Sequence, residues 1–296
     1  MRTSWMLGLA LLVAPVGAAM AAEEPAPINY GPPRLVATLA DKRISESSGV
    51  ACSRRTKDAF WTHNDSGDAP RLYAFDKKGK PLGTFQLAAV RAKDWEDMAS
   101  FTFRDKAWLL LGDVGDNARR RKTCTLYLVA EPKLPARRPT AITRLEPART
   151  IVFRYEDGPH DCESVAVDPA GPTVYLVSKS AATSCKAYAL DLPGTRPTKT
   201  LTAKAVSSVG ITYATATDLS PDGTRCAVLT YAHAYEFTRR TGEKWSAAFQ
   251  REPRRIGMPL RRQGESICYG PDGQALYLTS EKTPTPLWEV PALKAE

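Results

Sequence analysis

The chain has 296 residues, of which 43% are hydrophobic and 25% charged, and its formal net charge is +9 at pH 7. It holds a single long apolar run, near the N-terminus, which excludes a protein with several membrane-spanning helices. Its six cysteines show no C-x-x-C spacing, which argues against a zinc site.

The first residues have the pattern of an export signal. Arg2 precedes an apolar run over residues 5–16, and the A-x-A pattern at 19–21 is typical of a signal-peptide cleavage site. We therefore expect a signal peptide over residues 1–21 and one exported domain over residues 22–296, periplasmic or extracellular. No second apolar segment follows, so we expect no transmembrane segment after cleavage, and we expect a monomer.

The basic balance of the chain has two explanations. A positive surface favours anionic partners, such as an anionic small molecule or an envelope component. The arginines, however, are scattered in pairs along the chain, as on any solvated surface, and no nucleic-acid-binding motif accompanies them. Composition therefore leaves both explanations open.

Short segments that begin a strand recur along the chain. They are Ser48-Gly-Val-Ala, Glu96-Asp-Met-Ala, Glu163-Ser-Val-Ala, Thr215-Ala-Thr-Asp and Glu265-Ser-Ile-Cys. The steps between them are 48, 67, 52 and 50 residues, and periods of about 40 to 50 residues rich in strands are typical of β-propellers. The repeat predicts an all-β fold, a five-bladed β-propeller, with the five polar residues meeting on its axis.

The strands expected within each blade are short apolar runs bounded by Gly, Pro, Asp and Asn. In chain order they are 50–53, 59–64, 71–76 and 83–87, then 96 onward with 108–111, 125–130 and 150–155, then 163 onward with 173–177, 187–190 and 200–205. They continue with 215 onward, 225–231, 235–239 and a strand near 247–251, and end with 265–269, 275–279 and 287–290.

The last blade lacks its outer strand, because the chain ends soon after residues 287–290. The run at 34–39 precedes the first blade and belongs to no other. We expect this N-terminal strand to pair into the C-terminal blade, which closes the ring and leaves no open edge there.

The cysteines permit disulfides in an exported protein. Cys162 and Cys185 flank the same expected blade and are candidates for a bridge, with Cys124 as a rival partner for either. The remaining three lie inside strand patterns and are interpreted as small buried hydrophobic residues.

The polar ring is the expected site of chemistry. Glu96, Glu163 and Glu265 on a narrow axis raise one another's pKa values and cannot all stay ionised without a countercharge. A hard divalent cation bound by these carboxylates and by the hydroxyls of Ser48 and Thr215 resolves this, and Ca²⁺ suits such a flexible oxygen set better than Mg²⁺. The alternative is a water-filled channel whose glutamates are solvated or paired with Lys or Arg.

The ends of the second strands open on the same face as the ring. They carry His63-Asn-Asp65-Ser-Gly and Gly112-Asp113-Val-Gly-Asp-Asn, in which Asp beside Gly is either a turn former or a functional carboxylate. Phosphoryl transfer to water needs a metal, a carboxylate to orient the water and basic groups to hold the phosphate. Asp65 and Asp113 are the candidate catalytic residues. The candidate substrate-binding residues are Arg119, Arg120, Arg121, Lys122, Lys179 and Lys282.

Other active-site signatures are missing from the sequence. It contains no Gly-x-Ser-x-Gly elbow, no Gly-rich phosphate loop and no His-Glu-x-x-His. The three histidines are not spaced as a metal-binding set. Trp61, Trp95 and Trp108 alternate with apolar neighbours and are interpreted as core rather than as base-stacking platforms.

The ring resembles that of the five-bladed calcium-activated nucleotidase (apyrase) family. The serine, glutamate, glutamate, hydroxyl, glutamate order recurs as Ser48, Glu96, Glu163, Thr215 and Glu265. The resemblance implies a single Ca²⁺ in the central tunnel held by these side chains. Asp94 lies close to the position where that family can add a further acidic ligand, so the resemblance makes Asp94 a candidate metal ligand as well. No nucleotide-contacting motif of that family is present.

Three blocks are similar to a second group, the secreted bacterial β-propellers. They are His63-Asn-Asp-Ser-Gly, Asp94-Trp-Glu-Asp-Met-Ala and Gly112-Asp-Val-Gly-Asp-Asn. This similarity implies export and a propeller fold and leaves the activity open.

Two functional hypotheses follow. The first is an exported, Ca²⁺-dependent phosphohydrolase acting on nucleotides or other phosphate esters. The second is a non-catalytic propeller that binds a protein, glycan or envelope component, with the metal as a structural staple. Fold alone does not decide between them.

Overall fold

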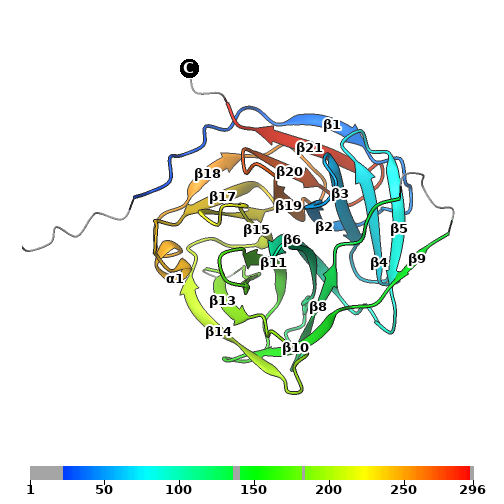
Figure 1. Cartoon of the computed structure of the whole chain (residues 1–296). Coiled ribbons are helices and arrows are strands. Elements are labelled where there is room, and N and C mark those ends of the chain that lie inside the picture. Colours follow the sequence, from blue (N-terminus) through cyan, green and yellow to red (C-terminus); the bar gives the residue numbers. More distant parts are fainter. Residues whose placement is uncertain (1–22, 136–140, 182–183, 294–296) are drawn as a thin grey trace, which may run out of the picture.

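The computed structural model describes residues 23–135, 141–181 and 184–293 (Figure 1). The expected signal peptide at 1–21 lies outside the described residues. Within them, strands and their connections make up nearly all of the chain, with one short helix, α1 (Trp245–Ala248). No helix in this part of the chain is long and apolar enough to cross a membrane. The expected all-β class is confirmed.

The strands form antiparallel groups that follow the sequence repeats. The first group is β2 (Ser47–Cys52), β3 (Ala59–Asn64), β4 (Arg71–Asp76) and β5 (Pro81–Leu87), with β9 (Thr143–Leu145) parallel to β5. The next two are β6 (Trp95–Phe103), β7 (Lys106–Asp113), β8 (Cys124–Ala130) and β10 (Arg149–Tyr155), and β11 (Cys162–Asp168), β12 (Thr173–Ser178), β13 (Lys186–Asp191) and β14 (Leu201–Ser208). The last two are β15 (Ala214–Leu219), β16 (Arg225–Thr230), β17 (His233–Thr238) and β18 (Arg254–Gly257), and β19 (Ser266–Tyr269), β20 (Ala275–Thr279), β21 (Pro286–Pro291) and β1 (Arg34–Thr38).

The groups surround a common centre, as in a β-propeller (Figure 1). The innermost strands β2, β6, β11, β15 and β19 contact one another in this order, and β19 contacts β2. At the outside, β10 and β14 pair in parallel and join the second and third groups into one eight-stranded sheet.

The two ends of the chain close the ring as expected. Strand β1 pairs antiparallel with β21, with Arg34 opposite Glu289. The same two side chains form an ion pair of 2.6 Å, so an N-terminal strand completes the sheet of the C-terminal group. This pairing leaves no free edge on β21.

The strand expected near 247–251 is wrong. This segment contains the end of α1 and a turn, and the outer strand is β18. Trp245, Ala248 and Phe249 lie three and four residues apart, so one helical turn points all three into the core, where each is at most 1% exposed. The rings of Trp245 and Phe249 stack with their centroids 5.2 Å apart.

Two turns of the same sequence type connect the innermost strand to the second strand in the last two groups, between β15 and β16 and between β19 and β20. Gly223 and Gly273 end the Pro-Asp-Gly segments with φ angles of +68° and +70°. Their N–H groups donate to the carbonyls of Ser220 (2.8 Å) and Gly270 (2.9 Å), which closes each turn. Glycine is favoured there because it adopts a positive φ without steric cost.

The core consists of apolar clusters, most of which pack neighbouring groups face to face. Trp61 and Trp95 are almost completely buried in it and Trp108 packs against it, which confirms their interpretation as core residues. All six cysteines are buried and free. Neither candidate bridge is formed: Cys162 and Cys185 belong to different clusters, and Cys124, the rival partner, is free as well.

Side-chain hydrogen bonds join the innermost strands around the axis. The buried carboxyl group of Asp97 in β6 accepts N–H groups from Met98 (2.8 Å), from Val165 of β11 (2.9 Å) and from Thr217 of β15 (3.1 Å). The Asp218 carboxyl accepts the N–H of Tyr269, which continues the connection from β15 to β19 at 2.8 Å.

The remaining steps of this circuit use serine hydroxyls. Ser47 Oγ lies 2.6 Å from Thr279 Oγ1 and so connects β2 to β20. Ser48 Oγ donates to the carbonyl of Glu96 at 2.6 Å and connects β2 to β6. These contacts fix β2 to β6, β6 to both β11 and β15, and β15 to β19, and the circuit returns to β2 through β20 of the last group.

We predict that Asp97→Asn destabilises the fold by about 3 kcal/mol, because the amide keeps only one acceptor oxygen, so either the N–H of Met98 or the N–H groups of Val165 and Thr217 are left unpaired. Urea unfolding of the two proteins measures this difference. The control is Asp191→Asn on the exposed end of β13, expected to change stability by less than about 1 kcal/mol. Equal effects of the two variants would contradict a special role for Asp97.

We also predict a pH dependence from Asp218. Burial raises its pKa from 3.8 to about 7, so the folded chain holds a proton that the unfolded chain releases. The stability that this proton supplies is complete below about pH 4 and is lost as the pH rises through about 7, by about 4 kcal/mol in total. Asp218→Asn should remove this part of the slope when unfolding is measured between pH 4 and 8. A variant with the parent's slope would contradict the prediction.

Candidate functional site

The five expected ring residues lie where the innermost strands begin, and all are buried. In four of these strands the pairing register shifts at the ring position, at Ser48, Glu96, Glu163 and Thr215. A β-bulge inserts an unpaired residue and changes the direction of its side chain. The side chains at these four bulges therefore point in a different direction from those of the paired residues beside them. Glu265 directly precedes β19.

The starts of the innermost strands lie opposite the ends of the second strands. Ser47 pairs with Asn64, and Trp95 with Asp113, for example. We call this side of the molecule the entry face. It carries the loops before β2, β6, β11, β15 and β19 and the loops after β3, β7, β12, β16 and β20.

Three carboxyl groups gather on the entry face. Asp65 follows β3, whereas Asp94 and Glu96 lie at the start of β6, and one oxygen of each lies within 4.8 Å of the others. Within the described residues, no ion pair involves any of the three. We call Asp65, Asp94 and Glu96 the acidic cluster.

The electrostatics of the acidic cluster favour a bound proton or cation. Burial, followed by the charges of Asp94 and Glu281, raises the pKa of Asp65 to about 6. Burial also raises the pKa of Asp94, and burial with the charge of Asp65 raises the pKa of Glu96 well above its ordinary value. Oxygen donors that carry negative charge and lack a countercharge fit a hard divalent cation.

Gly115 provides the space that the cluster occupies. A Cβ on this residue would lie 2.1 Å from Oε1 of Glu96 and 2.6 Å from Oδ2 of Asp94. The backbone holds the loop in place, because the N–H groups of Val114 and Gly115 both donate to the carbonyl of Asp94. The Gly112-Asp-Val-Gly-Asp-Asn block therefore places glycine against two of the cluster's carboxylates.

The other two glutamates of the ring have a different environment. Glu163 Oε1 forms an ion pair with Lys179, whose Nζ also donates to the hydroxyl of Tyr231 at 2.8 Å. Tyr231 in turn donates to Oε1 of Glu265 at 3.4 Å. This half of the ring therefore has a lysine countercharge, as the alternative of paired glutamates predicted.

Glu163 keeps one oxygen without a partner. Its Oε2 is buried and makes no hydrogen bond, and burial raises the pKa of the carboxyl despite the neighbouring Lys179. Glu163 also interacts electrostatically with Asp65 and Glu96. An unpartnered carboxylate oxygen next to the acidic cluster is a further ligand atom for a cation.

Glu265 has a raised pKa as well. Burial is the main cause, and a hydrogen bond with Glu281 adds to it. Lys282, an expected phosphate-binding residue, lies 3.3 Å from both Glu46 and Glu281. Its ammonium group is therefore shared between two carboxylates of the entry face.

The buried Asp113 and the half-buried Arg121 form an ion pair next to the cluster. Arg121 Nη2 contacts Oδ1 of Asp113 at 2.6 Å, and the N–H groups of Lys93 and Asp94 also donate to this carboxylate. Asp113 is 1% exposed. The pair therefore holds the segment that carries Asp94, and both partners are engaged within the protein.

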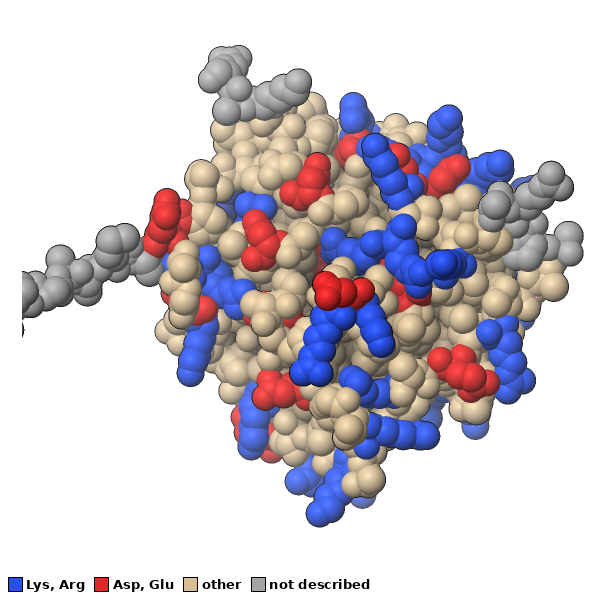
Figure 2. Space-filling view, viewed as in Figure 1, with Lys and Arg blue, Asp and Glu red and all other residues tan. Residues whose placement is uncertain are grey.

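The other basic residues of this loop point outward. Arg119, Arg120 and Lys122 are exposed. Figure 2 shows Lys and Arg side chains spread over the visible face among Asp and Glu, rather than gathered in one patch. This distribution agrees with a solvated basic surface on the face that is shown.

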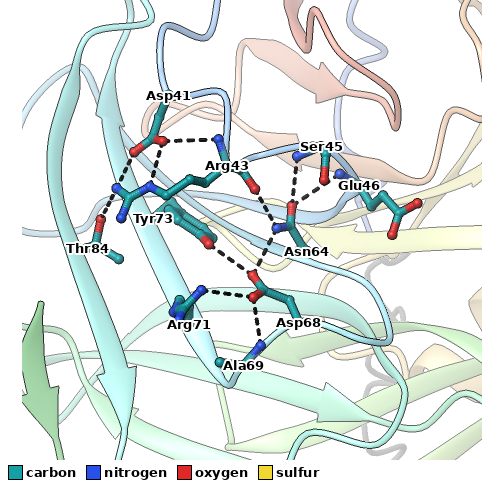
Figure 3. Close-up of polar contacts among 10 residues, drawn as sticks. All are labelled: Asp41, Arg43, Ser45, Glu46, Asn64, Asp68, Ala69, Arg71, Tyr73 and Thr84. Carbon is teal, nitrogen blue, oxygen red and sulfur yellow. Dashed lines mark hydrogen bonds and ion pairs between the residues drawn. The ribbon is translucent and has the colours of Figure 1, made fainter.

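In the His63-Asn-Asp-Ser-Gly block, Asn64 holds the loop through hydrogen bonds (Figure 3), and Asp65 belongs to the acidic cluster. Asn64 Oδ1 accepts the N–H groups of Ser45 and Glu46, and its Nδ2 donates to Arg43 O and to Asp68. Asn64 and Asp68 therefore secure the loop. The backbone N–H of Asp65 donates to the carbonyl of Glu46, whereas its carboxyl group accepts only the N–H of Ser66 among the described residues and so remains available to the cluster.

Sequence reasoning placed several of these residues but not their partners. The ring positions came from the repeat, whereas Asp65 was expected to act on water and is found beside Asp94 and Glu96. The roles of Gly115 and Tyr231 were missed. The sequence offered only their positions as a signal: Gly115 lies two residues after Asp113, and Tyr231 directly follows β16, the second strand of its group.

The comparisons bear on the fold. No protein-family model matches the chain, and no curated protein sequence matches it. Among solved structures, the chain is similar to a gluconolactonase from Xanthomonas campestris, with 13% sequence identity and a TM-score of 0.50. The match covers 93% of this chain and 99% of that protein. The likeness supports a propeller-type fold over nearly the whole length.

We predict that Gly115→Ala weakens cation binding without unfolding the protein, because its methyl group would occupy the space of the Glu96 and Asp94 carboxylates. Isothermal titration with CaCl₂ should show a loss of affinity of about ten- to a hundredfold, as for other changes to residues that touch the metal ligands rather than the metal. The matched control is Gly171→Ala, where no atom lies within 4 Å of the added carbon. Unchanged affinity in Gly115→Ala would place the cation elsewhere.

Proposed function

We propose that this chain is a metal-dependent hydrolase with its cation bound at the acidic cluster. The observation that carries the proposal is the approach of three buried or half-buried carboxyl groups within 4.8 Å, without a basic partner in the described residues. The unpartnered Oε2 of Glu163 supplies a further donor. Asp65, Asp94, Glu96 and Glu163 would hold the ion.

Calcium is the proposed cation. All the donors are oxygens, and Ca²⁺ accepts the irregular spacing of side chains from different loops more readily than Mg²⁺ does. The hydroxyls of Ser48 and Thr215 and the carboxyl of Glu265 would complete the set implied by the apyrase resemblance. A bound cation supplies Lewis acidity and lowers the pKa of its water.

The chain's own residues would position the reactants. Asp65 is half-buried and is carried by the loop after β3, where its carboxylate can accept a proton from water. Lys179 lies within hydrogen-bonding distance of Glu163 and Tyr231, where it can stabilise negative charge that develops on a substrate oxygen. Asp113 would act as a positioning residue through Arg121 and the Asp94 backbone.

Two substrate classes fit such a site. Phosphate esters, including nucleotides, are the class predicted from the basic residues, of which Arg119, Arg120 and Lys122 are exposed. Lactones are the class suggested by the similar fold of a gluconolactonase. Arg121, Lys179 and Lys282 are already paired with carboxylates, which favours a neutral ester or lactone over a phosphate.

The proposed protein is a five-bladed propeller that is exported from the cytoplasm. The innermost strands β2, β6, β11, β15 and β19 would each begin one blade of a five-bladed propeller. The pattern at residues 1–21 supports export to the periplasm or beyond, where free Ca²⁺ concentrations suit weak extracellular sites.

A non-catalytic propeller is the second candidate, and one observation favours it. Asp65 belongs to the loop after β3, whereas Asp94 and Glu96 belong to the next strand group. A cation bound by all three would therefore staple two groups together. Such a protein would bind Ca²⁺ and turn over no ester.

We predict that Ca²⁺ raises the melting temperature of the parent and that Glu96→Gln loses this shift. A ligand at one hundred times its Kd stabilises the native state by about 2.7 kcal/mol. Hydrolysis of glucono-1,5-lactone, p-nitrophenyl phosphate and ATP should be followed in the same samples. Glu146→Gln, a change in an exposed glutamate, is the control.

The outcomes separate the two candidates. A Ca²⁺-dependent turnover that is lost in Glu96→Gln and retained in Glu146→Gln supports the hydrolase. A melting shift without any turnover supports the structural staple. No shift at millimolar Ca²⁺, from metal-free protein, would contradict the metal centre itself.

A further inference from the structure

Two exposed tyrosines stand beside the ring on the entry face. Tyr213 is 45% exposed and Tyr231 is 43% exposed, and their ring centroids lie 6.4 Å apart at an interplanar angle of 47°. Tyr213 directly precedes β15 and Tyr231 directly follows β16, and the adjacent residues Ala214 and Thr230 pair with each other. Neither tyrosine belongs to the proposed metal centre.

Tyr213 adopts an unusual backbone conformation. Its φ angle is +55°, in the left-handed region that non-glycine residues rarely occupy. Its N–H donates to the carbonyl of Ser180 at 2.8 Å, which holds the residue in place. A bulky residue kept in a costly conformation, with its ring in solvent, is a feature typical of functional sites.

Tyr231 connects the aromatic pair to the ring. Lys179 Nζ lies 5.1 Å from the centroid of its ring and 2.8 Å from its hydroxyl, and this hydroxyl lies 3.4 Å from Glu265 Oε1. The exposed faces of the two tyrosine rings offer an apolar surface, and the carboxyl groups of Glu163 and Glu265 beside Tyr231 are polar groups that can form hydrogen bonds. A ligand on the tyrosines would therefore reach the ring carboxylates.

We propose that Tyr213 and Tyr231 form the subsite that binds a neutral, hydroxylated ring, such as a sugar or a sugar lactone. The proposal rests on the proposed hydrolase and names its substrate class. The C–H face of such a ring packs against aromatic side chains, and its hydroxyl groups donate to carboxylates. Tyrosine suits this task because it combines an apolar body with a polar end.

The charges around the subsite argue for a neutral ligand. Glu163, Glu265 and Lys179 are the charged groups beside Tyr231, and Lys179 is already engaged by Glu163. A phosphate group on the tyrosines would therefore find the basic group next to it already paired with a carboxylate. A nucleoside monophosphate, which also carries a stacking ring, is therefore the discriminating competitor.

Binding is tested directly on the metal-free mature chain. Methyl β-D-glucopyranoside is the neutral probe and AMP the anionic one, and saturation-transfer NMR measures contact with each. Tyr213→Asn removes the ring but keeps a residue that tolerates the left-handed backbone, and Tyr213→Phe keeps the ring. Leu260→Ala, which shortens a fully exposed apolar side chain, is the control.

The expected result is saturation transfer to the glucoside in the parent, in Tyr213→Phe and in Leu260→Ala, with a loss of about five- to tenfold in affinity in Tyr213→Asn. With the cation present, Tyr213→Asn should raise KM for glucono-1,5-lactone by a similar factor and leave kcat unchanged. The KM for methyl lactate, an open-chain ester, should not change, because the variant removes only the contact between Tyr213 and the sugar ring, and that contact is the same in the ground state and the transition state.

Other outcomes overturn one proposal or the other. Equal effects of Tyr213→Asn on the ring and open-chain substrates, or none on either, reject the subsite while the hydrolase stands. Stronger transfer to AMP than to the glucoside rejects the neutral ring. Glucoside binding that depends on Tyr213, without turnover of any ester, supports the subsite and rejects the hydrolase.

Discussion

The arrangement of the innermost strands depends on the hydrogen bonds that the carboxyl group of Asp97 accepts. This group sits completely buried in β6 and accepts backbone N–H groups from β6, β11 and β15. Adjacent strand groups do not share a backbone ladder at the axis, so their spacing needs side-chain contacts. Asp218, Ser47 and Ser48 supply the remaining steps of the circuit. The positions of all the entry-face residues follow from this spacing.

The bulges at the ring positions place polar side chains in the centre of the molecule, and the ion pair there separates the ring into two halves. A bulged residue leaves the paired ladder, and here four such residues are buried with their polar groups. Burial of a carboxylate is costly unless a charge compensates it. Lys179 compensates Glu163, whereas Asp65, Asp94 and Glu96 have no such partner among the described residues. The same ring thus contains a lysine-neutralised half and a half suited to a cation.

The likeness to a gluconolactonase concerns architecture, at 13% identity. Propellers support many activities, so the chemistry depends on the groups carried by the entry-face loops. In this chain those loops combine an acidic cluster, one engaged lysine and two exposed tyrosines. Most basic residues that would bind a phosphate are instead paired or directed outward. In the function that we propose, this distribution favours a neutral ring over the anionic esters expected from the basic residues.

The sequence by itself determined the repeat, the strands, the closing N-terminal strand and the buried ring positions, because periodicity and turn chemistry are local properties. It misplaced one strand, where Trp245, Ala248 and Phe249 bury one helical turn instead. Only the tertiary structure decided that Asp65 joins Asp94 and Glu96 and that Lys179 neutralises Glu163. These pairings depend on distances between loops of different strand groups, and no spacing along the chain encodes such distances.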